Sequence, residues 1–387
     1  MKNFFYFVIL ISFFSSGCYF STIKKNKPEV AVAKDSIVHK TVIPEAEFHR
    51  YYNASEQFYK QILEKSRFSG EFLVAKKGEI IYEKYAGFSN FSTKDSLNAT
   101  SALHLASVSK TFTAMAILKL WEEGKLQISD EASVYLAGFP YEGVTVKTLL
   151  NHRSGLPNYV HVMEQLGWNR NKIIFNADVL QFLITNKNKL QVGRPDRSFH
   201  YCNTNYALLA LIIEKVSGMP YPQFIYENFF APLGMNNSYV FTMSDSLRAL
   251  PSYNYKNQRE AFTYLDAVYG DKNIYSTVRD LLKWETALTY GNLFKKATLD
   301  SAYSGYSYEK KGIKNYGLGW RMLEYPNNEK IIYHNGWWHG NNTVFARIIQ
   351  DSATVIILGN RYNRNIYQAK KLFPAFGDYA TDEDTDE

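Results

Sequence analysis

The sequence predicts an α/β fold of the α+β kind, in which helices flank one antiparallel sheet and a large helical region is inserted between the strands. Strand patterns occur near the beginning of the chain, in residues 72–85, and return only after residue 315. Much of the intervening region, roughly residues 125–300, is helical in pattern. Strands at both ends with helices between them favour a sheet whose halves come from distant parts of the sequence.

The composition is that of a globular protein. The 387 residues are 46% hydrophobic and 16% aromatic, enough to bury a large core in one or two domains. The formal net charge is +7, but lysines and arginines are scattered and no basic run alternates with aromatic residues. We therefore expect no nucleic-acid partner. The mild basicity fits an envelope protein that faces anionic lipid or polymer.

The first residues are typical of a targeting segment. Lys2 provides a short basic region, Phe4 to Phe14 are apolar, and the apolar run is too short for a comfortable membrane span. Ser15-Ser16-Gly17-Cys18 resembles a bacterial lipoprotein cleavage box. We therefore expect residues 1–17 to be a lipoprotein-type signal peptide and Cys18 to be the lipidated N-terminus, anchored in a bacterial cell envelope. A plain secretory signal is the alternative.

The remaining chain divides into a tether, one domain and a tail. Residues 18–50 are polar and lack a clear period, which predicts a flexible tether. We expect the ordered domain over residues 51–373 and an acidic, disordered tail over residues 374–387. If Cys18 is acylated, Cys202 has no cysteine partner, so no disulfide holds the fold.

The domain is expected to begin with a helix from Tyr51 through Leu63. Two strands follow, at Phe72 to Ala75 and Ile80 to Tyr85, around a turn at residues 77–79. A second helix is predicted over residues 107–123, because apolar residues recur there at helical spacing and Gly124 follows.

The helical region that follows is broken at three glycine-containing turns, Gly155-Leu156-Pro157, Gly193-Arg194-Pro195 and Gly218-Met219-Pro220. Strand patterns then return at Tyr316 to Leu323, Ile331 to His334, Thr343 to Ile349 and Thr354 to Leu358. The last two strands are expected to form a hairpin through residues 350–353. A final helix is expected near residues 363–372.

The most informative motif is Ser107-Val108-Ser109-Lys110, which opens the second helix. Residues i and i+3 share a helix face, so Lys110 can reach the hydroxyl of Ser107 and take its proton. Ser107 would also lie in the first turn, where free backbone N–H groups favour negative charge. A serine hydroxyl needs such an adjacent base to become a nucleophile, so the motif favours a serine-acylating hydrolase.

The four-residue spacing is not specific by itself. Ser21…Lys24 and Ser307…Lys310 also match it, although only Ser107 is followed by a strong helix pattern. The alternative interpretation is an ordinary surface serine that caps an amphipathic helix.

A second candidate is Tyr201-Cys202-Asn203, just before a predicted helix from Tyr206 to Val216. Asn203 can cap that helix, which is also its purely structural explanation. Tyr201 would then be free to face a cleft. A tyrosine beside a cationic lysine has its pKa lowered, and the two groups titrate as a unit, so either one can be the base.

A third candidate is His334-Asn335-Gly336, which ends a strand pattern and precedes Trp337-Trp338. A glycine there would let the backbone approach a ligand closely. The structural alternative is a hairpin turn with Asn335-Gly336 at its centre.

In that order, Ser-x-x-Lys, Tyr-x-Asn and His-x-Gly resemble the motifs of the penicillin-recognising serine hydrolases, which include β-lactamases and penicillin-binding proteins. The pattern is most similar to the class C β-lactamase-like branch with its D-stereospecific peptidases and esterases, where Tyr-x-Asn replaces Ser-x-Asn. Residues 149–156, 206–209, 274–281 and 316–320 also agree with that branch. The resemblance covers roughly residues 55–365 and implies an α/β sandwich with an inserted helical region.

The resemblance implies roles for the motif residues. Ser107 would be the nucleophile, Lys110 its activating partner, and Tyr201 the general base that later protonates the leaving group. Asn203 would orient the lysine and bind substrate, and His334 would stand near the leaving group or a substrate carboxylate, with Gly336 beside it. The backbone N–H groups of Ser107 and Trp337 would form the oxyanion hole.

Two features depart from the β-lactamase pattern. His334 occupies a position where many relatives have lysine, and a neutral imidazole attracts a substrate carboxylate less. Trp337 and Trp338 stand where relatives often have small residues, which suggests a narrowed, aromatic-lined acyl pocket. Cys202 is expected to be a small filler, with a reactive thiol as the alternative.

The sequence therefore predicts a lipid-anchored serine hydrolase that cleaves an ester or amide in small esters, peptides or peptidoglycan-like material through an acyl-enzyme. A class C-like β-lactamase and a non-catalytic envelope binding protein are the alternatives. No cofactor is expected. No metal site is expected either, because there is no His-Glu-x-x-His motif and His334 and His339 are only a loose pair. The oligomeric state is not predicted.

Overall fold

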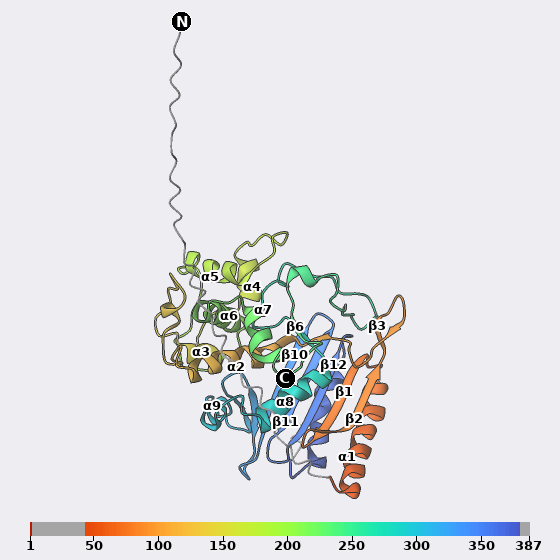
Figure 1. Ribbon diagram of the computed structural model, residues 1–387. Coiled ribbons are helices and arrows are strands. Elements are labelled where there is room, and N and C mark those ends of the chain that lie inside the picture. The colour runs from red at the N-terminus through yellow and green to blue at the C-terminus, as the bar shows by residue number, and fades with distance from the viewer. Residues whose placement is uncertain (2–42, 380–387) are drawn as a thin grey trace. The chain divides into compact units, whose positions relative to one another are not determined.

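The computed structural model describes residue 1 and residues 43–379 (Figure 1). The predicted signal peptide, Cys18, most of the predicted tether and residues 380–387 lie outside this part of the chain. In the part that is described, no helix combines the length and the apolar character that crossing a membrane requires.

The central element is an antiparallel sheet with the strand order β2-β1-β12-β11-β10-β9-β8. Its strands are β1 (Gly70–Lys76), β2 (Glu79–Ala86), β8 (Lys314–Tyr316), β9 (Arg321–Glu324), β10 (Lys330–Trp338), β11 (Asn341–Ile348) and β12 (Ala353–Gly359). The early strand β1 pairs along its whole length with the late strand β12. The predicted sheet with halves from distant sequence is thus confirmed.

Two small sheets accompany it. One pairs β3 (Phe88–Asn90) with β4 (Asp95–Ser96). The other has the order β5-β7-β6, formed by β5 (Leu103–His104), β6 (Tyr239–Val240) and β7 (Ile274–Ser276). Strands β6 and β7 interrupt the middle region, which the sequence predicted as mostly helical.

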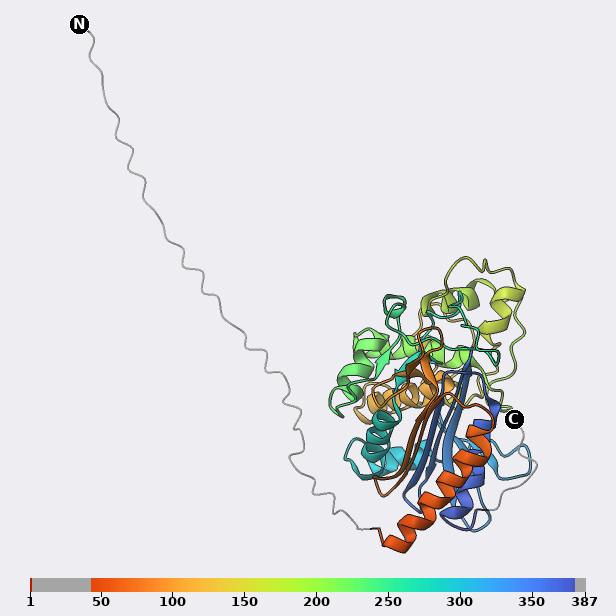
Figure 2. The same cartoon turned by 90° about the vertical axis from the view of Figure 1, so that its right-hand side faces the viewer.

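Helices cover both faces of the large sheet. The α-helices are α1 (Glu45–Phe58), α2 (Ser109–Glu122), α3 (Val146–Leu150), α4 (Tyr159–Gln165), α5 (Asn176–Thr185), α6 (Asn203–Ser217), α7 (Tyr221–Ile225), α8 (Val278–Tyr290) and α9 (Lys296–Ala302). The π-helical turns are η1 (Tyr59–Glu64) and η4 (Tyr226–Phe230), and the 3-10 turns are η2 (Ala106–Val108), η3 (Ala132–Val134), η5 (Met243–Asp245) and η6 (Arg364–Ala375). Helix α1 and η6 pack on one face (Figure 2), and α8 packs on the other.

Two apolar layers result from this arrangement. One lies between the sheet and the α1–η6 pair, and the larger one lies between the opposite face and the inserted helices. Helix α2 sits inside the larger layer, with every residue from Ser109 to Leu118 buried. A helix that is buried all round is a core element, so α2 is not the amphipathic surface helix of the structural alternative.

The ordered elements extend past the predicted domain boundaries at residues 51 and 373. Helix α1 begins at Glu45, directly after Pro44, and Ile43 is already buried. The charged residues of its first turns concealed this start from the apolar pattern. At the other end η6 runs to Ala375, and Tyr379 is buried with its hydroxyl donating to Asp351 at 2.6 Å.

The late strands differ from the predicted ones in one way that shapes the site. Strand β10 does not end at His334 but continues through Trp338, paired with β11 throughout. Trp338 pairs with Asn341, so the hairpin turn is His339-Gly340. Asn335-Gly336 therefore lies inside a strand, and the hairpin alternative for it is excluded.

Candidate active site

Ser107 lies on the 3-10 turn η2, between the short strand β5 and the buried helix α2. Its neighbour Ala106 has a φ of +48°, in the left-handed region that an alanine seldom adopts. His104 holds this conformation, because its Nδ1 accepts a hydrogen bond from the N–H of Ala106 at 3.0 Å. Strained backbone of this kind is common where a side chain must be presented to a substrate. Ser107 is half-buried, while both neighbours are buried.

Lys110 lies one turn into the helical segment, and its side chain is fully buried. Its Nζ is 3.0 Å from Ser107 Oγ, as the i, i+3 spacing predicted. The same nitrogen donates a hydrogen bond to the backbone carbonyl of Asp271 at 2.7 Å. The amine thus has two neutral oxygen partners, one of them the serine hydroxyl.

Tyr201 lies directly beside this lysine. The Nζ of Lys110 is 5.0 Å from the centre of the Tyr201 ring, and the guanidinium of Arg321 is 5.2 Å from it. Tyr201 is half-buried, so one side of its ring is accessible. Residues from η2, α2, the start of α6 and β9 therefore converge on one point.

Asn203 is placed differently from its predicted role as a helix cap. It is the first residue of α6, Cys202 occupies the cap position, and no side chain caps this helix. The carbonyl oxygen of the Asn203 side chain is buried and has no hydrogen-bond partner in the described part of the protein. Such an atom is costly unless something else binds it.

His334 lies on β10 and is fully buried. Its Nδ1 lies 2.7 Å from the carbonyl oxygen of Asn335, which fixes the proton on Nδ1, and its Nε2 lies 3.3 Å from the hydroxyl of Tyr316. Burial, with Arg321 and Lys110 adding to it, lowers the pKa of His334 well below its usual value. The imidazole is therefore neutral and forms part of the wall of the site.

Gly336 is required by close packing. A Cβ at this position would lie 2.3 Å from Thr343 Oγ1 and 2.6 Å from the carbonyl oxygen of Leu105. The backbone that the glycine approaches is thus the turn before Ser107. This contact sets the backbone of residues 336–337 against η2, where the two predicted oxyanion-hole groups, the N–H of Ser107 and that of Trp337, belong to adjacent segments.

The two tryptophans after Gly336 point to opposite faces of the sheet, because side chains alternate along a strand. Trp337 is 63% exposed and lies near Tyr362, away from the face that packs on η2. The expectation that Trp337 narrows the acyl pocket is therefore wrong. Trp338 lies on the same face as Gly336, toward η2, with the Lys272 Nζ 4.7 Å from its ring centre.

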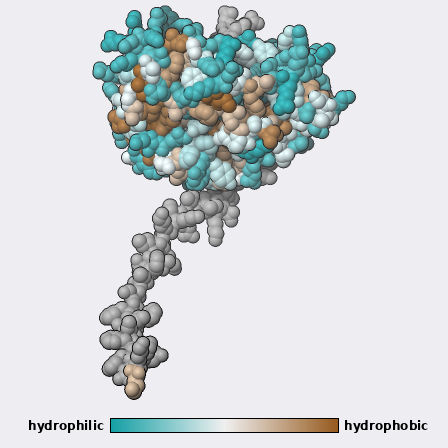
Figure 3. Space-filling model, turned by 90° about the horizontal axis from the view of Figure 1, so that it is seen from above, coloured by the Kyte–Doolittle hydropathy of each residue, from teal (hydrophilic) through white to brown (hydrophobic). Residues whose placement is uncertain are grey.

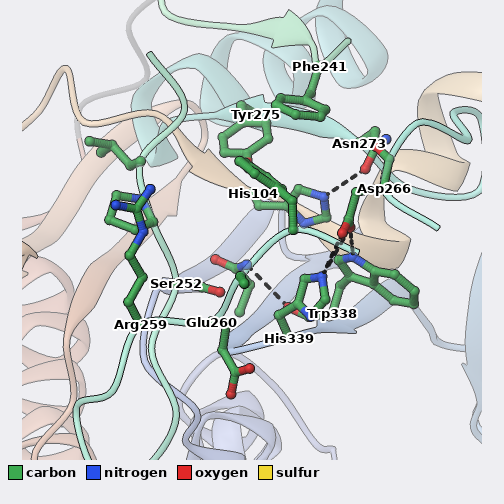
Figure 4. Close-up of a pocket in the computed structure, with 15 residues that line it drawn as sticks. His104, Phe241, Ser252, Arg259, Glu260, Asp266, Asn273, Tyr275, Trp338 and His339 are labelled. Carbon is green, nitrogen blue, oxygen red and sulfur yellow. Dashed lines mark hydrogen bonds and ion pairs between the residues drawn. The ribbon is translucent and has the colours of Figure 1, made fainter. Parts of the chain in front are cut away.

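Beside the Ser107 turn lies a cavity of about 310 Å³, shown in Figure 4. Asp266 lines it and accepts hydrogen bonds from Trp338 Nε1 and from His339. Burial by itself raises the pKa of Asp266, but the hydrogen bond from His339 outweighs burial and lowers this pKa to about 2. This carboxylate therefore fixes both side chains at the tip of the β10–β11 hairpin.

No role was predicted for His152, whose ring packs against Tyr201. Its ring centre is 4.4 Å from that of Tyr201, and its Nδ1 accepts the N–H of Cys202 at 3.1 Å. Burial, followed by the charge of Lys110, lowers its pKa well below the usual value, so the ring is neutral. His152 lies within residues 149–156, one of the segments that resemble the family, but no other feature of the sequence indicated its contact with Tyr201.

A second buried lysine was also missed. Lys272 Nζ donates to the Tyr159 hydroxyl at 2.6 Å and lies 3.4 Å from Asp271 Oδ1, and the Tyr159 hydroxyl donates to Asp271 Oδ2 at 3.0 Å. This cluster holds the backbone at Asp271, whose carbonyl oxygen accepts the hydrogen bond from Lys110. Tyr159 is more than a hundred residues away in sequence, so no local pattern reveals it.

Cys202 is fully buried, and its thiol donates to the carbonyl oxygen of Leu156. Burial raises the pKa of this thiol, which agrees with the filler rather than the reactive alternative. Among residues 43–379 there is no group of three or more His, Cys, Asp or Glu side chains that could hold a metal ion.

Comparisons with known proteins agree with this geometry. A protein-family model described as "Beta-lactamase" matches residues 56–371. Penicillin-binding protein 4* of Bacillus subtilis is 34% identical over 329 residues, which cover 81% of this chain and 72% of the relative.

Solved structures show the same fold. The D-stereospecific amidohydrolase from Streptomyces superposes with a TM-score of 0.64 at 19% identity, covering 86% of this chain and 99% of the other. The hydrolase EstCE1, which has promiscuous acyltransferase activity, superposes with a TM-score of 0.72 at 19% identity, covering 86% of this chain and 100% of the other.

Proposed function

Because the chain belongs to the β-lactamase family of serine hydrolases, which work through an acyl-enzyme, we propose that Ser107 is its nucleophile and that it cleaves an ester or an amide. The observation that carries this proposal is the position of the Lys110 amine. It lies 3.0 Å from Ser107 Oγ and 5.0 Å from the centre of the Tyr201 ring. An adjacent base is what a serine hydroxyl needs to attack a carbonyl carbon.

The reaction then follows from the geometry. Ser107 Oγ attacks the substrate carbonyl carbon while its proton passes to the Lys110–Tyr201 pair. The carbonyl oxygen becomes an oxyanion and accepts hydrogen bonds from the N–H groups of Ser107 and Trp337, a contribution of about 10²–10³ in rate per donor. Tyr201 protonates the leaving group as the carbon–heteroatom bond breaks. Water then attacks the acyl-enzyme and releases Ser107.

Asn203 supplies a group for substrate orientation. Its buried side-chain oxygen has no partner in the described part of the chain. A substrate N–H beside the scissile bond would satisfy it, which favours an acylamino or peptide-like substrate. D-amino-acid and peptidoglycan-type peptides meet this requirement, whereas an ester meets it only if its acyl part carries an amide.

An active-site serine probe tests the proposal directly. A fluorophosphonate should form a covalent adduct on the wild-type protein, measured by intact mass spectrometry, and none on Ser107→Ala. Ser307→Ala is the matched control, because Ser307 also precedes a lysine by three residues. An unlabelled wild-type protein, or labelling that survives Ser107→Ala, would contradict the proposal.

Two alternatives remain distinguishable by the same samples. Rapid turnover of a cephalosporin would identify a class C-like β-lactamase, which the neutral His334 makes less favourable because it offers no cation to the drug's carboxylate. A folded protein that binds substrate but never acylates would be an envelope binding protein.

We further propose that Cys18 is lipidated and that the enzyme works in a bacterial cell envelope. The support is the targeting pattern and the Ser-Ser-Gly-Cys box of residues 15–18. In a bacterial host, labelled palmitate should enter the wild-type protein and not Cys18→Ala. Labelling that is equal in both would refute the anchor.

A further inference from the structure

A second cavity lies beside the chain segment that leads to Tyr201. It measures about 880 Å³ and lies between α4 and the chain that follows α5. Gly155 to Asn158 line one side of it and His200, the residue before Tyr201, lines another. Figure 3, which views the end of the molecule that carries α4 and α5, shows this face as largely hydrophilic with separate apolar patches.

The cavity is continuous with the framework of the catalytic tyrosine. Cys202 Sγ is 3.3 Å from the carbonyl oxygen of Leu156, and the N–H of His200 donates to the carbonyl of His152 at 2.8 Å. Thr204 Oγ1 donates to the carbonyl of Pro157 at 2.6 Å. The cavity floor and the Tyr201 segment are therefore parts of one hydrogen-bonded unit.

The charges around the cavity have one sign. Lys189, Arg194 and Arg197 line it and are exposed, and no aspartate or glutamate is among its lining residues. In the described part of the chain none of these three side chains takes part in an ion pair or a hydrogen bond. Carboxylates nearby are already engaged, since Asp196 binds Arg153 and Glu164 binds Arg170. The cavity is thus a cationic groove with an apolar floor that includes Leu156 and Leu190.

We propose that this groove binds the leaving-group side of the substrate and selects a segment that carries carboxylates. The inference rests on the proposed function, because it takes Tyr201 as the acid that protonates the leaving group. A substrate held at Ser107 then directs its departing part past Tyr201 and His200 into the groove. Clustered positive charges whose neighbouring carboxylates are already paired with other residues favour an anionic partner and raise its rate of association.

The test uses two depsipeptides that share one acyl group and an ester scissile bond. Their leaving segments end in Gly-Gly-Glu-Glu or in the isosteric Gly-Gly-Gln-Gln, so only charge differs. We expect kcat/KM to be about three- to tenfold higher for the glutamate form at low salt, as befits a few exposed ion pairs. This ratio should fall toward one at high ionic strength, where exposed charges are screened.

Charge reversal locates the effect. Lys189→Glu, Arg194→Glu and Arg197→Glu should each reduce the preference for the glutamate form and together invert it. Lys60→Glu on η1, an exposed lysine on the opposite side of the sheet, is the matched control and should keep the wild-type ratio. The inference is overturned if the wild-type protein has the same kcat/KM for the glutamate and glutamine forms. It is also overturned if the three charge reversals together leave the wild-type ratio of these two values unchanged.

The same samples separate this inference from the proposed function. Turnover of the glutamine form that is lost in Ser107→Ala supports the hydrolase whether or not the groove discriminates. Binding of fluorescently labelled Glu-Glu and Gln-Gln peptides to Ser107→Ala tests the groove without any reaction. Tighter binding of the glutamate peptide, reversed by the three substitutions, supports the groove even if no ester is cleaved; equal binding overturns it.

Discussion

The protein holds two buried lysines that each lie beside a tyrosine, and the two pairs differ in the groups that contact the amine. Lys110 lies beside Tyr201, and its amine contacts the Ser107 hydroxyl and a backbone carbonyl. Lys272 lies beside Tyr159, and its amine contacts the carboxylate of Asp271. Among residues 43–379 no carboxylate forms an ion pair with Lys110.

The difference separates a reactive amine from a structural one. Burial lowers the pKa of Lys272, but the Asp271 carboxylate opposes this and favours the ammonium form. Burial and Asp271 also raise the pKa of Tyr159 well above its usual value, so its hydroxyl keeps its proton. Lys110 has only neutral partners, and losing its proton breaks no ion pair. Tyr201 is half-buried, whereas Tyr159 is buried.

The largest expected effect comes from removing each amine in turn. Lys110→Met should lower kcat/KM by about 10³-fold or more while the protein stays folded, because Ser107 loses its base. Lys272→Met should instead lower the free energy of unfolding by about 3–5 kcal/mol, because Asp271 is left buried and unpaired. Steady-state ester hydrolysis and urea unfolding of both variants measure the two effects.

The comparison would fail if the two variants exchanged behaviours. A Lys110→Met enzyme with near-wild-type turnover would show that the amine is dispensable. A Lys272→Met enzyme that is stable but inactive would place Lys272 in the chemistry. Asp271→Asn with Lys272→Met is the control, because it removes the buried charge together with its partner.

The tyrosines give the next effect. Tyr201→Phe should lower kcat by about 10²–10⁴-fold, the usual contribution of a general acid–base group. Tyr159→Phe removes a hydroxyl between Lys272 and Asp271 and should cost about 1–3 kcal/mol of stability, with kcat changed little. A pH profile of kcat/KM that loses one limb in Tyr201→Phe, and keeps both in Tyr159→Phe, would assign the titrating group.

Only one of the two pairs could be predicted from the sequence. Ser107 and Lys110 are three residues apart on a helix pattern, so their contact follows from helix geometry. Tyr201 was found through its place before a helix and its resemblance to a family motif. Tyr159 and Lys272 share no pattern, because their contact depends on how α4 packs against the segment before β7. Tertiary packing of this kind leaves no period in the sequence.

The same limit explains the errors around β10. Asn335-Gly336 is a strong turn sequence, but pairing with β11 on one side and packing on η2 on the other keep it in a strand. Asn203 is a good capping residue by type, yet Cys202 holds the cap position. In both cases long-range packing overrode a local preference.

The buried histidine His104 makes the stability of the protein depend on pH. His104 contacts the Asn273 amide at 3.1 Å, and burial lowers its pKa to about 4. The unfolded chain binds this proton at a pKa of about 6.5, so stability should fall by up to about 3 kcal/mol as the pH drops from 6.5 to 4. His104→Gln should flatten the curve of unfolding free energy against pH in that window, measured by urea unfolding at fixed pH values.

The Asp266 carboxylate affects stability in a different, more acidic pH range. The pKa of Asp266, held at about 2, gives stability that is present above about pH 4 and lost below it. His104→Gln should leave this acid limb unchanged. If the variant lost stability at pH 7 as much as at pH 4, its effect would come from packing on Ala106 and not from protonation.

The smallest effect is expected from a residue that the sequence had placed in the acyl pocket. Trp337→Ala should change kcat/KM by less than about threefold across acyl groups of different size, because exposed side chains away from the site contribute little. Its backbone N–H, which the substitution keeps, is the group that we propose for the oxyanion hole. Trp338→Ala is the matched comparison: it removes the ring that Asp266 anchors over Lys272 and should alter the ranking of acyl groups. A changed ranking in Trp337→Ala with an unchanged one in Trp338→Ala would mean that the strand presents the opposite face to substrate. That result would also remove the Trp337 N–H from the oxyanion hole.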